Sequence, residues 1–184
     1  MSPWELPTTA LIGGRLYHLH TDYRDVLEIF RYLDDENLQE VLRWRIALAL
    51  FYEETLPPEH WQEAMVYLAE FLRCGDPEAS PGPKLLDWQQ DGSLIVADIN
   101  KTAGAEIRAM PYLHWWTFLA WFHAIGEGQL STVVAIRDKL RRGKKLESWE
   151  QDYYRKNKKR VDLPKRYSPA EQAQMEQLLR RLDG

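Results

Sequence analysis

The spacing of hydrophobic and polar residues divides the first part of the chain into a short hairpin and a helix. Residues 11–20 alternate in side-chain type around Gly13-Gly14, and this pair suits a tight turn between two strands, so the segment predicts a small β-hairpin. Asp22 then stands where the N-cap of a helix is expected. The apolar residues that follow recur every three to four positions and predict one buried helix face, formed by Val26, Leu27, Ile29, Phe30 and Leu33.

Two more helices are predicted before residue 75. The first spans about residues 37–54 and is ended by Pro57-Pro58, and the second begins near Glu59 and ends before Gly75. The expected buried face of the first helix consists of Leu38, Val41, Leu42, Arg45, Leu48, Ala49 and Tyr52. That of the second consists of Trp61, Ala64, Met65, Leu68, Phe71 and Leu72. Residues 75–83 are rich in turn formers and predict an exposed linker between two helical halves.

The helical pattern resumes after this linker. A helix is predicted over about residues 93–106, and the aromatic run over 112–125 is apolar almost all round, which places it at the centre of the fold. Ser131 is the predicted cap of the next helix, and a basic segment containing tyrosines reaches about residue 160. Ser168-Pro169-Ala170-Glu171 has the form of a capping box with proline at the first helical position, which predicts a short amphipathic helix.

These elements predict a mostly α fold, a helical domain with a small N-terminal β-hairpin. Residues 1–10 are expected to be an extended tail, residues 11–166 a single domain that includes the linker, and residues 167–184 the C-terminal helix. A length of 184 residues suits one domain, and 45% hydrophobic with 28% charged residues is the balance of a packed globule. Cys74 is the single cysteine and the first ten residues lack the features of a signal peptide, so we expect a cytoplasmic protein.

Charge is distributed unevenly along the chain. Residues 1–100 hold 7 Lys/Arg against 18 Asp/Glu, a net charge of −11, whereas residues 101–184 hold 17 against 10, a net charge of +7. Such a division favours association with a partner of opposite charge. The basic half suits an acidic protein, a nucleic acid or the acidic half of a second copy, and the sequence leaves these alternatives open.

Histidines supply no recognisable metal site. His18 and His20 are two positions apart on a predicted strand, where both can face one side, but no third ligand stands nearby. His114 and His123 lack the spacing of four residues and the intervening glutamate of a helical zinc motif. We therefore predict structural roles for these side chains and no bound metal.

Nucleotide-binding and nucleophilic motifs are also missing from the sequence. Gly143-Lys144 matches the second glycine and the lysine of a phosphate-binding loop, but Asp138 stands where the first glycine belongs and Lys145 where Ser or Thr should follow. Cys74 has no sequence cue to a neighbouring base. We predict that the protein is not an enzyme and uses no cofactor.

The basic segment over residues 137–166 holds 13 Lys/Arg against 5 Asp/Glu, interleaved with aromatic residues. Single-strand nucleic-acid binders show this mixture, and so does a solvated helix that meets an acidic protein. The sequence pI of about 5.8 favours the protein partner, because nucleic-acid modules commonly exceed a pI of ~9. The predicted partner-binding residues are Lys144, Lys145, Trp149, Tyr153, Lys156, Lys158 and Lys159.

The segments Asp87-Trp88-Gln89-Gln90-Asp91 and Leu113-His114-Trp115-Trp116 are the most specific part of a longer pattern, which spans roughly residues 15–160 and includes Ile136-Arg137. Taken in order, these segments resemble a family of bacteriophage proteins, the gene-product-fifteen family. The motif residues that we expect in the core are Asp87, Asp91, His114, Trp115, Trp116, Phe118 and Arg137.

This resemblance implies a function in the assembly of the phage tail. The family is placed among tail-assembly chaperones, which hold the tape-measure protein in solution while tail-tube subunits polymerise around it. The expected partners are therefore the tape-measure and tail-tube proteins, in the cytoplasm of the bacterial host, with self-association as a further expectation and no membrane. The alternative is a nucleic-acid-binding module that uses residues 137–166.

Overall fold

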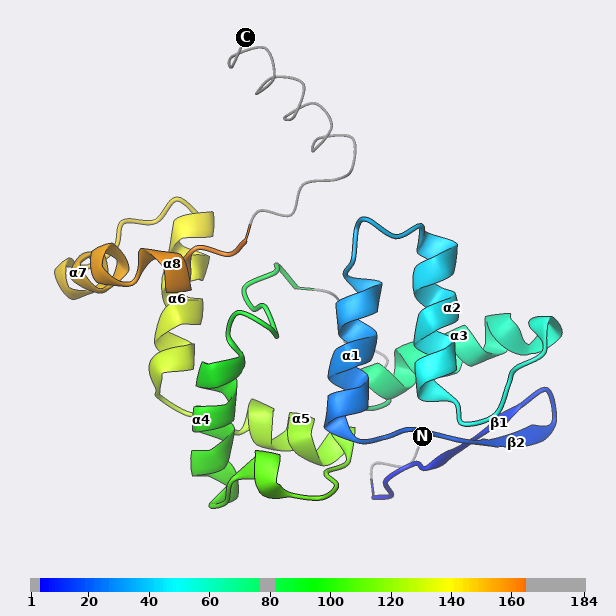
Figure 1. The fold of residues 1–184 in the computed structure, drawn as a ribbon. Helices are drawn as coiled ribbons and strands as arrows, with labels where there is room; N and C mark the ends of the chain where they lie inside the picture. The colour runs from blue at the N-terminus through cyan, green and yellow to red at the C-terminus, as the bar shows by residue number, and fades with distance from the viewer. Residues whose placement is uncertain (1–3, 77–81, 165–184) are drawn as a thin grey trace, which may run out of the picture. The chain divides into compact units, whose positions relative to one another are not determined.

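The computed structural model describes residues 4–76 and 82–164 (Figure 1). These residues fall into two compact units, one within residues 1–77 and the other within residues 78–164, and each is described by itself. We call them the N-terminal unit and the second unit. The predicted helix over residues 167–184 lies outside the described residues. The single domain expected over residues 11–166 stays a prediction.

The N-terminal unit begins with the predicted hairpin. Strands β1 (Thr9–Ile12) and β2 (Arg15–His18) pair antiparallel, with Ile12 opposite Arg15 across the Gly13-Gly14 turn. Both glycines have positive φ, 56° and 76°, which residues with a Cβ adopt at a cost. Helix α1 (Tyr23–Leu33) follows, and the Asp22 carboxylate accepts the Arg24 N–H as predicted for its cap.

Three further helices lie in the described part of the N-terminal unit. They are α2 (Glu40–Phe51), the short 3-10 helix η1 (Pro58–His60) and α3 (Trp61–Leu72). Helix α2 is shorter than the predicted 37–54. At its start, Asp35 holds residues 35–38 in a turn by accepting the Asn37 and Leu38 N–H groups. At its end, Tyr52 is extended and forms an isolated bridge with Leu19.

The buried face of α2 differs from the predicted one. Leu48 and Tyr52 are buried as predicted, but Val41 and Leu42 are 69% and 43% exposed, and the buried Ala47 and Phe51 were not predicted. The prediction was wrong at these positions because apolar residues surround almost the whole of this helix, so their spacing alone does not select a face. Helix α3 buries Ala64, Leu68 and Phe71 as expected, and the Phe51 and Phe71 rings lie 4.8 Å apart between their centroids.

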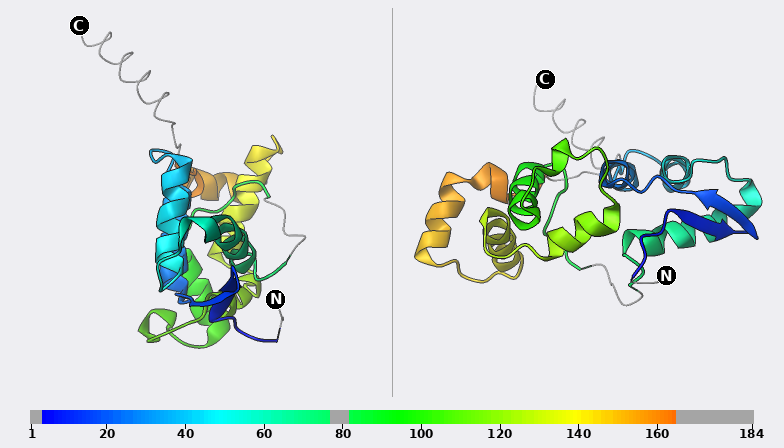
Figure 2. Two further views of the ribbon diagram at one scale, coloured as in Figure 1. Left: turned by 90° about the vertical axis from the view of Figure 1, so that its right-hand side faces the viewer. Right: turned by 90° about the horizontal axis from the view of Figure 1, so that it is seen from below.

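Helices alone form the described part of the second unit. They are α4 (Gly92–Ala103), η2 (Ile107–Ala109), α5 (Trp115–His123), α6 (Gln129–Arg141), α7 (Ser148–Lys156) and α8 (Lys158–Val161). Helix α4 packs against α5 and α6, and α8 packs against α6 and α7 (Figures 1 and 2). The prediction of a mostly helical fold with an N-terminal hairpin is confirmed.

Two helix ends in the second unit differ from the prediction. Helix α4 ends at Ala103 because Gly104 adopts a left-handed conformation with φ of 68°, a common helix C-terminus. Ser131 is not the N-cap of α6. Gly128 is the cap, and the Ser131 hydroxyl lies one turn into the helix, where it accepts the Gly128 N–H. Among the described residues, no helix is both long and apolar enough to span a bilayer.

Candidate partner-binding surface and the buried ion pair beneath it

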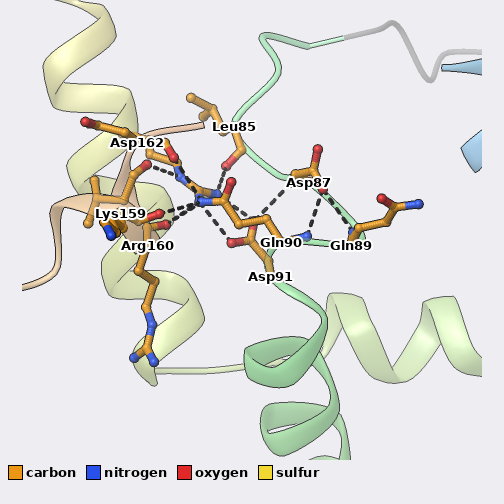
Figure 3. Close-up of polar contacts among 10 residues, drawn as sticks. Leu85, Asp87, Gln89, Gln90, Asp91, Lys159, Arg160 and Asp162 are labelled. Atoms are coloured by element: carbon orange, nitrogen blue, oxygen red, sulfur yellow. Dashed lines mark hydrogen bonds and ion pairs between the residues drawn. The ribbon is translucent and has the colours of Figure 1, made fainter. Parts of the chain in front are cut away.

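Arg137 is the centre of a buried polar cluster in the second unit. Figure 3 labels its partners Leu85, Asp91 and Arg160. Its guanidinium group reaches from α6 to the Asp91 carboxylate, which precedes α4. The two groups form a bidentate pair with Nη1–Oδ2 and Nη2–Oδ1 distances of 2.6 and 2.9 Å. The Asp91 side chain is fully buried and that of Arg137 is 5% exposed. This pair links two segments that are 46 positions apart in the sequence.

The remaining N–H groups of Arg137 bind backbone carbonyls. Nε donates to Val161 at 2.7 Å, Nη2 donates to Arg160 at 2.8 Å, and Nη1 donates to Leu85 at 2.9 Å. All five guanidinium donors therefore have an acceptor. The carbonyls at a helix C-terminus have no partner within the helix, so the cation satisfies and stabilises the end of α8.

Gln90 adds a second set of bonds to the same end of α8. Its Nε2 donates to the carbonyls of Arg160 and Asp162 at 2.8 and 2.9 Å. The carboxylate of Asp87 orients Gln90 by accepting its backbone N–H, and the Asp87 N–H in turn donates to Asp91. The segment over residues 85–91 thus holds α8 in place, with Arg137 as the common partner.

Aromatic motif residues form the interior of the same unit. His114 caps α5 by accepting the Trp116 N–H at its Nδ1, and both residues are buried. Trp115 and Phe118 are each 1% exposed, and their rings stack with centroids 5.5 Å apart. All seven motif residues, Asp87, Asp91, His114, Trp115, Trp116, Phe118 and Arg137, lie buried within the second unit. Trp121, Leu119 and Phe122 on the same helix are half-buried.

The seven predicted partner-binding residues lie on the α6–α7 loop, α7 and α8. Lys144 and Lys145 are in the loop, whereas Trp149, Tyr153 and Lys156 recur at helical spacing along one face of α7. Lys158 and Lys159 belong to α8. We call this set the α7–α8 surface; it consists of Lys144, Lys145, Trp149, Tyr153, Lys156, Lys158 and Lys159. The Trp149 side chain is 55% exposed. Tyr153 is half-buried, and its hydroxyl is buried with no hydrogen-bond partner among the described residues.

The five lysines of the α7–α8 surface differ from the neighbouring cations. All five are exposed, and within the described ranges none forms an ion pair. By contrast, Arg141 and Arg142 pair with Asp138, and Arg155 pairs with Asp152. The paired arginines are partly neutralised by their own helix.

Glu150 fixes the start of α7. Its buried carboxylate accepts a hydrogen bond from Nζ of Lys139 at 2.7 Å and one from the Glu147 N–H at 2.8 Å. The bond with Glu147 is part of a capping box at the start of the helix. The hydrogen bond from Lys139 lowers the pKa of Glu150, and the carboxylate raises the pKa of Lys139. Both groups therefore stay charged at neutral pH, so α7 is tied to α6 at one end while Arg137 holds α8 at the other.

The residues considered for chemistry are dispersed. His18 pairs with Glu54 at 2.7 Å on the outside of the hairpin, and His20 and His123 are exposed. In residues 4–76 and 82–164, no group of three His, Cys, Asp or Glu side chains is placed to hold a metal ion. Burial raises the pKa of the Cys74 thiol to about 11, which keeps it protonated at neutral pH.

An apolar groove between α2 and α3 is a feature that the sequence analysis missed. It has a volume of about 450 Å³ and is lined by Val41, Trp44, Leu48, Trp61, Met65 and Val66, with Glu40 and Arg45 among its other residues. The signal was present in α2, whose apolar residues exceed what one buried face requires.

Residues 5–163 match the model of a protein family described as Bacteriophage Gp15 protein. No curated protein and no solved structure matches the chain.

Proposed function

The chain belongs to the bacteriophage Gp15 protein family, and from this premise we propose that it is a tail-assembly chaperone. In this role it binds the tape-measure protein, the tail-tube protein or both, in the cytoplasm of the bacterial host. It acts by binding and not by catalysis. The family resemblance on the Asp87–Asp91, His114–Trp116 and Arg137 motifs supports this assignment.

The observation that carries the proposal is the set of five unpaired lysines beside an exposed tryptophan on the α7–α8 surface. A solvated helix face commonly pairs its cations with neighbouring acids, as Arg141, Arg142 and Arg155 do here. Unpaired cations provide long-range attraction and an aromatic side chain provides buried contact area, a combination that suits an acidic protein surface. We assign the client-binding contact to this surface.

The buried Arg137 cluster has a supporting role in this proposal. Removing a guanidinium and a carboxylate from water can cost more free energy than their mutual attraction returns. The buried Asp91–Arg137 pair is therefore weak evidence for added stability, and we interpret it as a device that positions the segments it joins. In this unit it fixes the carbonyls of α8, from which Lys158 and Lys159 project. The motif residues therefore build the binding surface without forming part of it.

Co-expression with the neighbouring tail genes tests the proposal. The tape-measure protein is produced alone, with this protein, and with this protein plus the tail-tube protein, and its soluble fraction and co-purification are measured. The proposal expects the tape-measure protein to stay in solution and to co-purify only when this protein is present. Unchanged solubility, together with no co-purification of either tail protein, would refute it.

A nucleic-acid-binding function is the second candidate, favoured by the same unpaired lysines beside Trp149. It predicts affinity for single-stranded DNA or RNA that falls steeply as salt rises, because counterions are released on binding. Nuclease treatment during the co-purification separates the two functions. Retention of the tape-measure protein after nuclease supports the chaperone, and its loss supports the nucleic-acid module.

A further inference from the structure

We infer that the apolar groove between α2 and α3 is the docking site for helix α7 of a second copy of this chain. This inference goes beyond the proposed function and does not depend on which tail protein is bound. It places two surfaces of one molecule in contact with each other across copies. The groove belongs to the N-terminal unit and α7 to the second unit.

The groove has the properties of a helix-binding surface. Its lining includes the indole rings of Trp44 and Trp61 and the thioether of Met65. The methionine side chain is flexible and can adapt to an inserted side chain. Val41 and Val66 are 69% and 50% exposed on facing helices. Exposed apolar side chains that lie next to one another on two helices favour burial by a partner.

Acidic groups flank the groove at both ends of α2. Glu40 lines it at the N-terminal end. At the other end a second hollow shares Arg45, Leu48 and Trp61 with the groove and is also lined by Glu53. Neither Glu40 nor Glu53 forms an ion pair among the residues that the structure describes. Between these two carboxylates the groove is apolar except for Gln62 and Arg45, whose guanidinium carbon lies 5.4 Å from the centre of the Trp61 ring.

Helix α7 carries the complementary arrangement. Trp149 is 55% exposed near its start and Tyr153 follows one turn later, with the unpaired Lys145 before the helix and Lys156 at its end. The order along α7 is therefore cation, aromatic residues, cation. Glu40 begins α2 and Glu53 follows two residues after its end, whereas Lys145 precedes α7 by three residues and Lys156 ends it. In both arrangements the charges therefore lie at or just beyond the ends of a short helix, about 18 Å long for α2 and about 14 Å for α7.

Opposite net charges favour the same contact. Residues 4–76 hold 6 Lys/Arg against 14 Asp/Glu, a charge of −8, and residues 82–164 hold 14 against 10, a charge of +4. Because the groove and α7 are different surfaces, the contact is heterologous, and a pair of copies keeps a free α7 on one copy and a free groove on the other. Repetition of the contact gives a ring or an open chain of copies. A client that binds α7 competes with this contact.

Two variants with complementary defects test the inference. Val41→Arg/Val66→Arg puts cations in the groove at exposed positions, and Trp149→Ala removes the aromatic residue from α7. Wild type is expected to assemble at low salt, with a mass that rises with concentration, and to dissociate at high salt because exposed charges are screened over ~8–10 Å. Each variant alone is expected to be a monomer of 21.7 kDa.

The mixture of the two variants gives the decisive result. The Trp149→Ala chain keeps an intact groove and the Val41→Arg/Val66→Arg chain keeps an intact α7, so an equimolar mixture forms one contact and stops at a dimer. Leu11→Arg/Leu16→Arg, on the exposed face of the hairpin, is the control of equal charge and should assemble as wild type. Circular dichroism checks that all variants are folded.

Several results would overturn the inference: a monomeric wild type at every concentration, a variant mixture that stays monomeric, or a Trp149→Ala chain that assembles as wild type. Carbodiimide cross-linking of a mixture of light and heavy isotope-labelled wild type needs no variant. It should join Lys145 or Lys156 of one copy to Glu40 or Glu53 of another. Failure of these tests leaves the tape-measure assay untouched, so the inference and the proposed function fail separately.

Discussion

Asp91 and Arg137 form a bidentate ion pair that is shielded from water and that also supports the end of α8 through Arg137. The pair connects three parts of the second unit that are distant in sequence. They are the segment before α4, helix α6 and the backbone carbonyls of residues 160 and 161. Its geometry requires a planar group with five donors, which only arginine supplies.

Replacing Arg137 should destabilise the second unit strongly. Arg137→Met leaves the buried Asp91 carboxylate uncompensated, and we expect a loss of about 3–5 kcal/mol in the free energy of unfolding. Arg137→Lys keeps the charge but loses most of the hydrogen bonds, so it should resemble Arg137→Met more than wild type. Denaturant titration measures both, with Arg141→Gln as a control that should change the free energy by less than about 1 kcal/mol.

The double variant Asp91→Leu/Arg137→Met separates the charge from the carbonyl contacts. Removing both charges relieves the buried carboxylate, so this variant should be more stable than Arg137→Met alone. It should stay below wild type because the carbonyls of Leu85, Arg160 and Val161 lack their donor. Hydrogen exchange should show faster exchange at the Val161 and Asp162 amides in both variants. Unchanged exchange there would contradict the role of Arg137 in holding α8.

Gly13 should tolerate no side chain, in contrast to its neighbour Gly14. A Cβ on Gly13 would lie 2.1 Å from Nε2 of His60, whereas nothing lies within 4 Å of one on Gly14. Gly14→Ala should cost about 1–2 kcal/mol for the left-handed backbone alone. Gly13→Ala should cost more, because His60 must also move and its hydrogen bond with Tyr17 is disturbed. Equal melting temperatures for the two variants would contradict this packing.

Phe118 should behave as a core residue. Its ring is 1% exposed and stacks on Trp115, so Phe118→Ala should lower the free energy of unfolding by about 3–5 kcal/mol. Tyr112→Ala, at a 52% exposed position just before the same helix, is the control and should have a much smaller effect. A Phe118→Ala chain with wild-type stability but no partner binding would show that this face is an interface.

The contact between His18 and Glu54 should depend on pH. The hydrogen bond with Glu54 raises the pKa of His18 above 6.5, and the same bond lowers the pKa of Glu54 below 4.5. Its stabilisation is therefore lost as pH rises through the raised pKa of His18, and also as pH falls through the lowered pKa of Glu54. NMR titration should give a lower His18 pKa in Glu54→Gln than in wild type, while Glu53→Gln changes it little. An unaltered pKa in Glu54→Gln would show that the contact is absent in solution.

The sequence predicted the elements of this fold better than their contacts. Turn and cap residues such as Gly13 and Asp22 act within a few positions, so local spacing identified the hairpin and α1. Contacts such as Asp91 with Arg137 depend on how helices pack, and sequence spacing carries no information on which distant charge meets which. The motif residues were nevertheless expected in the core, where the structure places them.

The groove shows a different limit of sequence reading. Helix α2 has apolar residues on several sides. Hydrophobic spacing therefore predicted that Val41 and Leu42 are buried, although both are exposed in the structure. Only the position of α1 and α3 decides which side of α2 is covered. The lysines of the α7–α8 surface could be predicted as a group, but their lack of ion pairs, which separates them from Arg141 and Arg155, follows from side-chain geometry.

If the unpaired lysines of the α7–α8 surface contact the client protein, as we propose, their charge should be needed for binding and that of the paired arginines should not. Two triple variants of equal charge test this, Lys156→Gln/Lys158→Gln/Lys159→Gln and Arg141→Gln/Arg142→Gln/Arg155→Gln, through the amount of soluble tape-measure protein that co-purifies at matched expression. We expect recovery close to wild type with the arginine variant and, with the lysine variant, a fall in recovery that corresponds to about tenfold weaker affinity, or roughly 1.4 kcal/mol. Equal recovery with wild type and both variants would show that the client contact does not use these lysines.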